Sequence, residues 1–158
     1  FSRSLQSEVN AGFDWELIGP CNRVAEFQAI QPTLFQVEDR IVAFCRTRQG
    51  CISQTSSTDN GESWSAMTST ALPNPNAGID GITARSGRHY LVYNPVLEGR
   101  SPLVVAASDD LEEWHTIKIL EAEPGEYSYP AIMEDSQGVL QITYTWRRQC
   151  IQHISLAV

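Results

Sequence analysis

Residues 56–64 read S-S-T-D-N-G-E-S-W, and this stretch decides the fold. Asp59 and Asn60 favour a tight turn because their short polar side chains bond neighbouring backbone N–H groups. Gly61 supplies a left-handed backbone conformation without steric cost, and Trp64 anchors the turn by burying a large ring. A calcium-binding EF-hand loop needs acidic residues at alternate positions and a glutamate at its twelfth position, and that pattern is absent. We therefore interpret Asp59 as a residue that shapes a turn and predict no metal site.

The turn recurs later in the chain, which indicates an internal repeat. Trp114 lies 50 residues after Trp64, in S-D-D-L-E-E-W, and each tryptophan follows an aspartate, Asp59 or Asp109, by five residues. We interpret the later stretch as a degraded copy of the same turn, in which Leu111 replaces the glycine.

Strand-like segments between these turns recur with nearly the same spacing. Gln31, Asp80 and Tyr129 open three of them at steps of 49 residues, and the segments are short, rich in β-branched and aromatic residues, and bounded by turn formers. No stretch sustains a helical period, so we expect little helix. The expected strands lie near residues 31–37, 40–47, 51–57 and 64–70, then 80–85, 89–94, 103–108 and 114–120, and finally 129–134, 139–146 and 150–157.

Four-stranded units of this length are typical of β-propeller blades. The sequence therefore predicts an all-β fold of antiparallel blades, about three per chain, in a single domain over residues 1–158. The third blade lacks a fourth strand, which the segment around Trp15, another echo of the turn, has the character to supply in the same chain or in a partner. The expected blades span approximately residues 22–72, 73–121 and 122–158 plus 13–20.

Three blades are too few to close a ring, since propellers use four or more. Either two copies form a six-bladed ring or the chain is half of a longer one. The preference of oligomers for closed symmetry favours the homodimer.

Composition excludes several classes of partner. The net charge of −8 argues against nucleic acid, because phosphate binding needs a basic surface. No apolar run reaches the roughly 18 residues of a membrane span.

The sequence shows no signal peptide, which slightly favours the cytoplasm and leaves the compartment open. The four cysteines form no zinc-binding pattern, so we expect free buried thiols, with a Cys45–Cys51 disulfide as the alternative, and no cofactor.

The stretch S-T-D-N-G-E-S-W at residues 57–64 resembles the Asp box, S-x-D-x-G-x-[ST]-W, of the sialidase (bacterial neuraminidase repeat) superfamily. The resemblance continues in A-I-Q-P-T-L-F, L-P-N-P-N-A-G-I-D-G, L-V-Y-N-P, G-R-S-P-L and G-E-Y-S-Y-P-A-I, and covers nearly the whole chain. The chain looks like the C-terminal half of a six-bladed sialidase-like propeller. The resemblance implies that the Asp box is a structural turn on the propeller rim, far from the active site.

Propeller ligands bind near the central channel, at the end where the innermost strands begin. The candidate residues at that end mix arginines, carboxylates, tyrosines and amides, a composition that suits an acidic sugar because arginine binds carboxylates through paired N–H groups. The candidates for catalysis are Asp80, Glu126 and Tyr127, and those for substrate binding are Gln31, Arg46, Arg48, Asn76, Asn94, Arg100, Tyr129, Trp146 and Arg147.

The resemblance implies roles for several of these residues. Arg46 and Arg100 resemble the second and third of the three arginines with which sialidases hold the substrate carboxylate. Tyr127, followed by a serine, resembles the nucleophilic tyrosine. A tyrosine needs a nearby base near neutral pH, and Glu126 and Asp80 are the candidates.

Three functions stay open. The first is a sialidase-like exo-glycosidase that acts on an acidic or deoxy sugar, with Asp80 and Glu126 as the two carboxyls. The second is a carbohydrate-binding propeller without turnover. It is favoured because Gln31 stands where sialidases place a glutamate, and because the first arginine and the acid aspartate belong to an N-terminal half outside this chain. The third is a structural or interaction module, in which Asp80 caps a turn and Tyr129 and Trp146 are packing residues.

Overall fold

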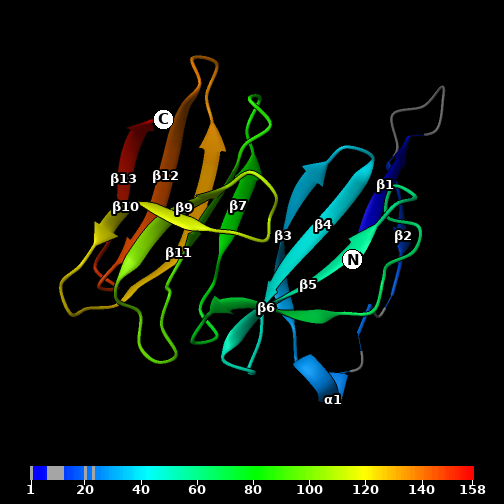
Figure 1. Cartoon of the computed structure of the whole chain (residues 1–158), viewed down its shortest axis with the longest axis horizontal. Coiled ribbons are helices and arrows are strands. Elements are labelled where there is room, and N and C mark those ends of the chain that lie inside the picture. Colours follow the sequence, from blue (N-terminus) through cyan, green and yellow to red (C-terminus); the bar gives the residue numbers. More distant parts are fainter. Residues whose placement is uncertain (1, 7–12, 20, 23) are drawn as a thin grey trace.

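The computed structural model describes residues 2–6, 13–19, 21–22 and 24–158 (Figure 1). The described residues form an all-β fold with one short helix. None of the helical residues described is part of a helix long and apolar enough to cross a membrane. The elements are β1 (Ser2–Gln6), β2 (Phe13–Leu17), α1 (Val24–Phe27), β3 (Ile30–Val37), β4 (Arg40–Arg46), β5 (Cys51–Ser57), β6 (Thr68–Pro73), β7 (Asp80–Thr83), β8 (His89–Tyr93), β9 (Leu103–Ser108), β10 (His115–Glu121), β11 (Tyr127–Glu134), β12 (Val139–Trp146) and β13 (Cys150–Ala157).

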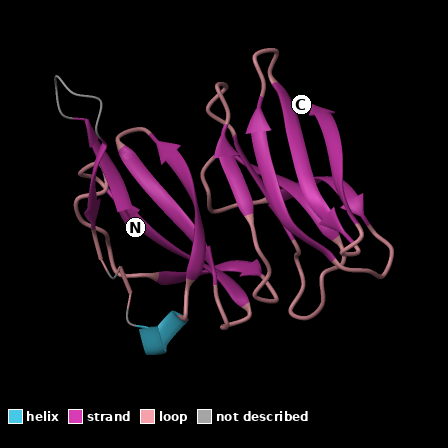
Figure 2. Ribbon diagram, turned by 180° about the vertical axis from the view of Figure 1, so that it is seen from behind, coloured by secondary structure: helices cyan, strands magenta, loops and turns pink. Residues whose placement is uncertain are grey.

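Three antiparallel sheets stand side by side like the blades of a propeller (Figure 2). Blade 1 contains β3–β6, blade 2 contains β7–β10 and blade 3 contains β11–β13, and in each the strands neighbour one another in chain order. The prediction of an all-β fold built from about three antiparallel blades is confirmed.

The strand boundaries follow the sequence closely except in the last strand of blade 1. That strand was expected near residues 64–70 and runs instead over Thr68–Pro73. The cause is Ser65, whose hydroxyl accepts the Ser56 N–H at 3.0 Å and so takes a partner that the ladder would use. The ladder with β5 begins only at the Thr68–Gln54 pair.

Blade 2 lies between the other two and supplies the middle of the core. Every residue of β8 and β9 is buried, whereas the inner strands β3 and β11 of the outer blades alternate between buried and exposed positions. Gly81 sets the spacing between blades 1 and 2, because a Cβ atom there would clash with the ring of Phe35. A one-sided pattern on β3 and β11 is what strands with only one covered face should show.

The first two strands form a separate two-stranded sheet. β2 pairs with β1 over the Ser2–Leu17 to Gln6–Phe13 register, and the described part of β13 pairs only with β12. The alternative in which the Trp15 segment completes the third blade of its own chain is therefore not what the structure shows. Completion by the same segment of a partner chain stays a prediction.

The four cysteines are free, so no Cys45–Cys51 disulfide forms. Cys45 is buried, and that burial raises the pKa of its thiol to about 11. The expectation of burial fails for Cys150, which is exposed, while Cys21 and Cys51 are half-buried.

Candidate functional site

The first rim turn, residues 57–64 between β5 and β6, is held by its own side chains. Asp59 Oδ1 accepts the Ser63 N–H at 2.9 Å and the Ser57 hydroxyl at 2.7 Å, and Oδ2 accepts the Ser63 hydroxyl at 2.5 Å. Ser57 Oγ accepts the Gly61 N–H at 2.8 Å. The bonds from Ser63, followed by that from Ser57, lower the pKa of Asp59 to about 2. These contacts agree with the interpretation of Asp59 as a residue that shapes a turn.

The second rim turn, residues 108–114 between β9 and β10, has the same construction. The Trp114 indole N–H donates to the Leu111 carbonyl at 3.0 Å, as the indole of Trp64 does to the Gly61 carbonyl at 3.2 Å. Leu111 therefore does take the place of Gly61, with a left-handed φ of 67°.

The sequence-based pairing of Asp109 with Asp59 is wrong. Asp110 takes that role: its Oδ1 accepts the Ser108 hydroxyl at 3.0 Å and two backbone N–H groups of the turn, at 2.8 and 2.9 Å. The second turn has one residue fewer between its serine and its tryptophan, so counting back from the tryptophan reaches the wrong aspartate. Asp109 instead forms a surface ion pair with Arg88 at 3.3 Å.

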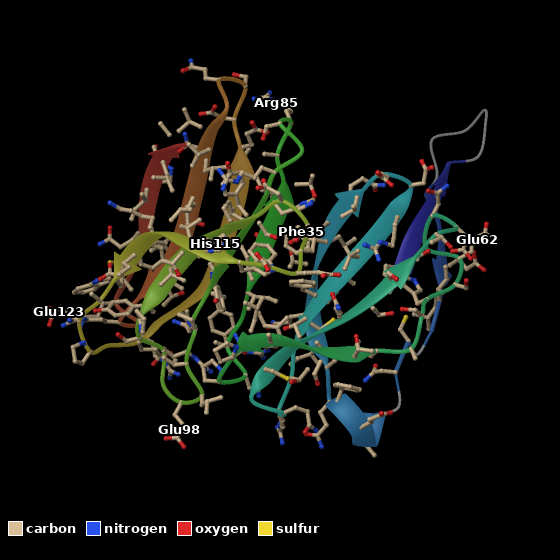
Figure 3. The ribbon with its side chains drawn as sticks, viewed as in Figure 1. Phe35, Glu62, Arg85, Glu98, His115 and Glu123 are labelled. Atoms are coloured by element: carbon tan, nitrogen blue, oxygen red, sulfur yellow. The ribbon has the colours of Figure 1, made fainter. Side chains whose placement is uncertain are left out.

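The opposite end of the blades, where β3, β7 and β11 begin, is called the site end below. Figure 3 shows Arg85, on the β7–β8 turn, and Glu98, on the loop after β8, pointing away from the molecule at these two opposite ends. Most of the candidate residues lie at the site end, as the propeller geometry predicts.

Two arginines from neighbouring blades converge at the site end. Arg46 Nη1 donates to the Asn76 carbonyl oxygen at 3.1 Å, and Arg100 Nη2 lies 3.4 Å from the same oxygen. Arg100 Nη1 also donates to the Pro75 carbonyl at 3.0 Å. Both guanidinium groups share one acceptor. The distance between Arg46 Nη1 and Arg100 Nη2 is therefore at most the sum of their two distances to the Asn76 oxygen. The fold thus places two positive charges side by side, and neither arginine is in an ion pair with a carboxylate of the described residues.

A cavity of about 540 Å³ opens next to Arg46 and Asn76. Two buried polar atoms at its wall, Arg46 Nε and Asn76 Oδ1, have no hydrogen-bond partner. Buried polar atoms are nearly always paired, so this orphaned donor and acceptor are exceptions, and both belong to residues that line the cavity. The cavity is lined by Asn22, Gln28, Ala29, Ile30, Arg46, Arg48 and Asn76.

Asp80 ties the inner strands of all three blades together. Its Oδ1 accepts the Thr33 hydroxyl of β3 at 3.0 Å, and its Oδ2 accepts the Ile132 N–H of β11 at 2.9 Å. Both carboxylate oxygens are therefore engaged within the protein. The structure places Asp80 where the sequence expected it, but with its oxygens turned towards the neighbouring strands.

Tyr127, Arg147, Trp146 and Glu126 form a second group at the site end, where β11 meets the β12–β13 turn. Arg147 Nε and Nη2 lie 3.3 and 3.2 Å from the Tyr127 hydroxyl, and its guanidinium carbon lies 4.8 Å from the Trp146 ring centroid. The Arg147 N–H donates to the Glu126 carbonyl at 2.7 Å. Tyr127 is 0% exposed, so its hydroxyl lies against the guanidinium of the exposed Arg147 and not in the solvent.

The β12–β13 turn contains a residue that sequence reasoning missed. Arg148 Nε lies 2.6 Å from Glu126 Oε2, and both Arg147 and Arg148 have left-handed backbones, with φ of 51° and 54°. Such conformations are unfavourable for arginine and persist where surrounding contacts enforce them. The doublet W-R-R gave no compositional sign of this turn, because hairpin turns of two left-handed residues favour asparagine and glycine.

Tyr129 and Gln31 are matching positions on the inner strands of blades 3 and 1. Both are exposed, both have left-handed backbones, with φ of 50° and 53°, and both sit where the register with the second strand shifts. Tyr129 is 58% exposed and its ring packs over Gly78, where a Cβ would lie 3.1 Å from Cδ1. Of the two tyrosines in Y-S-Y, Tyr129 is the one that faces outward.

Three further residues differ from what their sequence context suggested. Asn94 is fully buried and bonds only backbone carbonyl groups, so it does not face a ligand. Gln28 and Asn22 line the cavity, although the segment before β3 carried no motif. Among the described residues, no three histidine, cysteine, aspartate or glutamate side chains are grouped as a metal ion would require.

Comparison with known proteins agrees with this fold. The BNR repeat-like domain family matches residues 3–142. The intramolecular trans-sialidase of Ruminococcus gnavus, solved with oseltamivir carboxylate, superposes with a TM-score of 0.74 at 15% identity, over 99% of this chain and 38% of that one. The NanB sialidase of Streptococcus pneumoniae gives 0.73 at 15% identity, over 99% and 27%.

A third solved structure is similar to the same degree. The leech intramolecular trans-sialidase, complexed with 2,7-anhydro-Neu5Ac, gives a TM-score of 0.75 at 13% identity, over 99% of this chain and 27% of that one. The chain thus spans about a quarter to two fifths of the length of the solved structures that it matches. A search of curated protein sequences found no match.

Proposed function

The chain belongs to the BNR repeat-like domain family, and from that premise we propose that it is part of a sialidase-like glycoside hydrolase that takes an acidic sugar of a glycan. The observation that carries the proposal is the convergence of Arg46 and Arg100 on the Asn76 carbonyl. Two solved relatives hold oseltamivir carboxylate and 2,7-anhydro-Neu5Ac, which are both acidic molecules.

The arginine pair suits a carboxylate for an electrostatic reason. Two guanidinium groups side by side repel each other, and a backbone carbonyl offers only a partial negative charge. A sugar carboxylate would supply a full charge and could accept charge-assisted bonds from both groups.

The exposed Tyr129 is the tyrosine that we propose to contact the sugar. A residue that attacks or stabilises a reacting sugar must reach it, and the fully buried Tyr127 does not meet that condition. Tyr127, Glu126 and Asp80 remain candidates for supporting roles, because each is held by hydrogen bonds or an ion pair within the protein.

Carbohydrate binding without turnover is the second candidate. It is favoured by Gln31, because an amide cannot act as a base and Gln31 matches Tyr129 in its exposure and its left-handed backbone.

We also propose that two copies associate to complete a six-bladed ring. The support is the one-sided burial of β3 and β11, which leaves Leu34 and Met133 more than half exposed on the two outer blades.

A fluorogenic sialoside assay combined with titration of N-acetylneuraminic acid tests the proposal. We expect Arg100→Ala and Arg46→Ala each to weaken binding by at least about tenfold, because each removes charge-assisted bonds. Arg88→Ala, which removes a surface arginine beside Asp109, is the matched control and should bind like the wild type.

The outcomes separate the candidates. Hydrolysis that both site variants abolish supports the hydrolase. Binding without hydrolysis supports the second candidate. Wild-type affinity in Arg100→Ala would overturn the carboxylate site.

A further inference from the structure

A single buried amide joins blades 2 and 3 at the site end. Asn94 follows β8 and is fully buried. Its Nδ2 lies 2.9 Å from the Arg100 carbonyl, 2.9 Å from the Pro102 carbonyl and 3.2 Å from the Tyr127 carbonyl. The first two acceptors belong to the loop between β8 and β9, and the third to β11.

The chemistry of this position requires a donor. Three carbonyl oxygens surround one atom, and an amide nitrogen offers two N–H groups that can be shared among them. Rotating the amide by a half turn would place Oδ1 of Asn94 against the same three oxygens, so the orientation is fixed by repulsion. Oδ1 itself is buried and has no partner, which is a cost that the three bonds on Nδ2 offset.

The Arg100 backbone is the element that these bonds fix. Its carbonyl accepts the Asn94 amide and, from the other blade, the Tyr127 N–H at 3.3 Å. Arg100 and Glu126 also form an isolated bridge between the two loops. The Arg100 side chain then runs from this fixed point to the Pro75 and Asn76 carbonyl groups.

We propose that Asn94 is the positioning residue that places Arg100 next to Arg46, and that it does so by anchoring Arg100 to the Tyr127 backbone of blade 3. Asn94 is fully buried, and its proposed effect on the site passes through the backbone of Arg100. The inference rests on the proposed carboxylate site for its effect on binding. Its effect on Arg100 is independent of what that site binds.

The same anchor extends to the β12–β13 turn. Tyr127 is held at its other end by Arg147, which donates to its hydroxyl. A Cβ on Gly125 would lie 2.7 Å from that hydroxyl, so the ring has no room to shift towards the preceding loop. The Arg100 backbone is therefore bonded to blade 3 and not to its own loop alone.

The test uses Asn94→Asp and Asn94→Ser in the full chain. Asn94→Asp keeps the shape and removes both donors, whereas Asn94→Ser keeps one donor on a shorter side chain. The first readout is the NMR Nε–Hε resonance of Arg100, assigned by its loss in Arg100→Lys. The second is the affinity for N-acetylneuraminic acid.

Thr55→Val is the matched control, because the buried Thr55 hydroxyl donates to the Ser65 carbonyl at 2.7 Å at the rim. We expect the Asn94 variants to shift the Arg100 resonance and to weaken binding by about tenfold or more. Thr55→Val should lower thermal stability and change neither readout.

An unshifted Arg100 resonance in a folded Asn94 variant would overturn the proposal. If Asn94→Asp does not fold, Asn94→Ser decides by the same criterion. If the wild type does not bind N-acetylneuraminic acid, the proposed function fails while the Arg100 resonance still tests the role of Asn94.

Discussion

The two ends of the blades treat polar groups in opposite ways. At the rim, the carboxylates of Asp59 and Asp110 accept hydrogen bonds from their own turns, and this arrangement occurs in both blade 1 and blade 2. At the site end, buried polar atoms are left without partners, and no two blades present the same set. The unpartnered atoms in the described part of the chain are Arg46 Nε, Asn74 Nδ2, Asn76 Oδ1, Asn94 Oδ1 and Ser128 Oγ, all at the site end.

This difference assigns folding stability to the rim end of each blade and ligand binding to the site end. A turn that satisfies its own polar atoms stabilises the blade and leaves nothing for a ligand. An end of the blades that leaves buried donors and acceptors unpaired is less stable than it would otherwise be, a cost that functional sites commonly carry. The rim should therefore respond to substitution in stability, and the site end in binding.

Gly125→Ala should have the largest effect, and it should reduce both the stability of the protein and its affinity for the ligand. The new Cβ would lie 2.7 Å from both Cζ and Oη of Tyr127, which is held by Arg147, so the loop or the ring must move. We expect a loss of about 3 kcal/mol in the free energy of unfolding and weaker ligand binding, measured by denaturant titration and by calorimetry. Gly87→Ala is the control: it is strained by a φ of 88° but meets no atom within 4 Å. An equal loss in both variants would contradict the argument from crowding.

Ser57→Ala should come next and act on stability alone. The substitution removes the acceptor of the buried Gly61 N–H and a donor to Asp59. Leaving a buried N–H without a partner should cost about 1–2 kcal/mol. Denaturant titration measures the loss, and binding of N-acetylneuraminic acid should be unchanged. A binding defect in Ser57→Ala would show that the two ends are coupled.

The fold could be predicted from the sequence because its signals are local and repeated. Turn chemistry, alternating strands and a 49-residue step each point to the same blades, and agreement between them is what a foldable sequence requires. The failures are also local. The start of β6 was misplaced because the Ser65 hydroxyl replaces a ladder bond, an event that no propensity encodes.

The candidate site could be predicted only as a neighbourhood. The strand register predicts that Arg46, Asn76 and Arg100 lie at one end of the blades. It does not predict the direction in which each side chain points. The place of Asn94 at a strand end and the resemblance of Tyr127 to the sialidase nucleophile make both residues candidates, and both are fully buried. Burial depends on packing between residues that are distant in the chain, and the local patterns of a sequence do not show that packing.

Asp110→Asn and Asp109→Asn should give a smaller effect that sharpens the comparison of the two rim turns. Asp110 accepts bonds from the turn backbone, whereas Asp109 is an exposed partner of Arg88. We expect the Asp110 variant to lower the melting temperature and the Asp109 variant to leave it within about 1 °C, because isolated surface ion pairs contribute little. Scanning calorimetry at neutral pH measures both. Equal melting temperatures in the two variants would contradict the assignment of Asp110, and not Asp109, as the counterpart of Asp59.

The smallest expected effect is a pH dependence that belongs to the rim. Ser63 and Ser57 hold the pKa of Asp59 at about 2, below the ordinary value of 3.8, and backbone N–H groups lower the pKa of Asp110 in the same direction. A carboxyl whose pKa is depressed by folding stabilises the protein fully above its unfolded pKa, and this contribution is lost as the pH falls towards the folded value. The melting temperature should therefore fall between about pH 4 and pH 2, and less steeply in Asp59→Asn than in the wild type. Glu98→Gln, on the exposed loop of the site end, is the control. A wild-type slope in Asp59→Asn would mean that the rim bonds do not set the acid stability, and that the division between a self-satisfied rim and an unsatisfied site end is drawn in the wrong place.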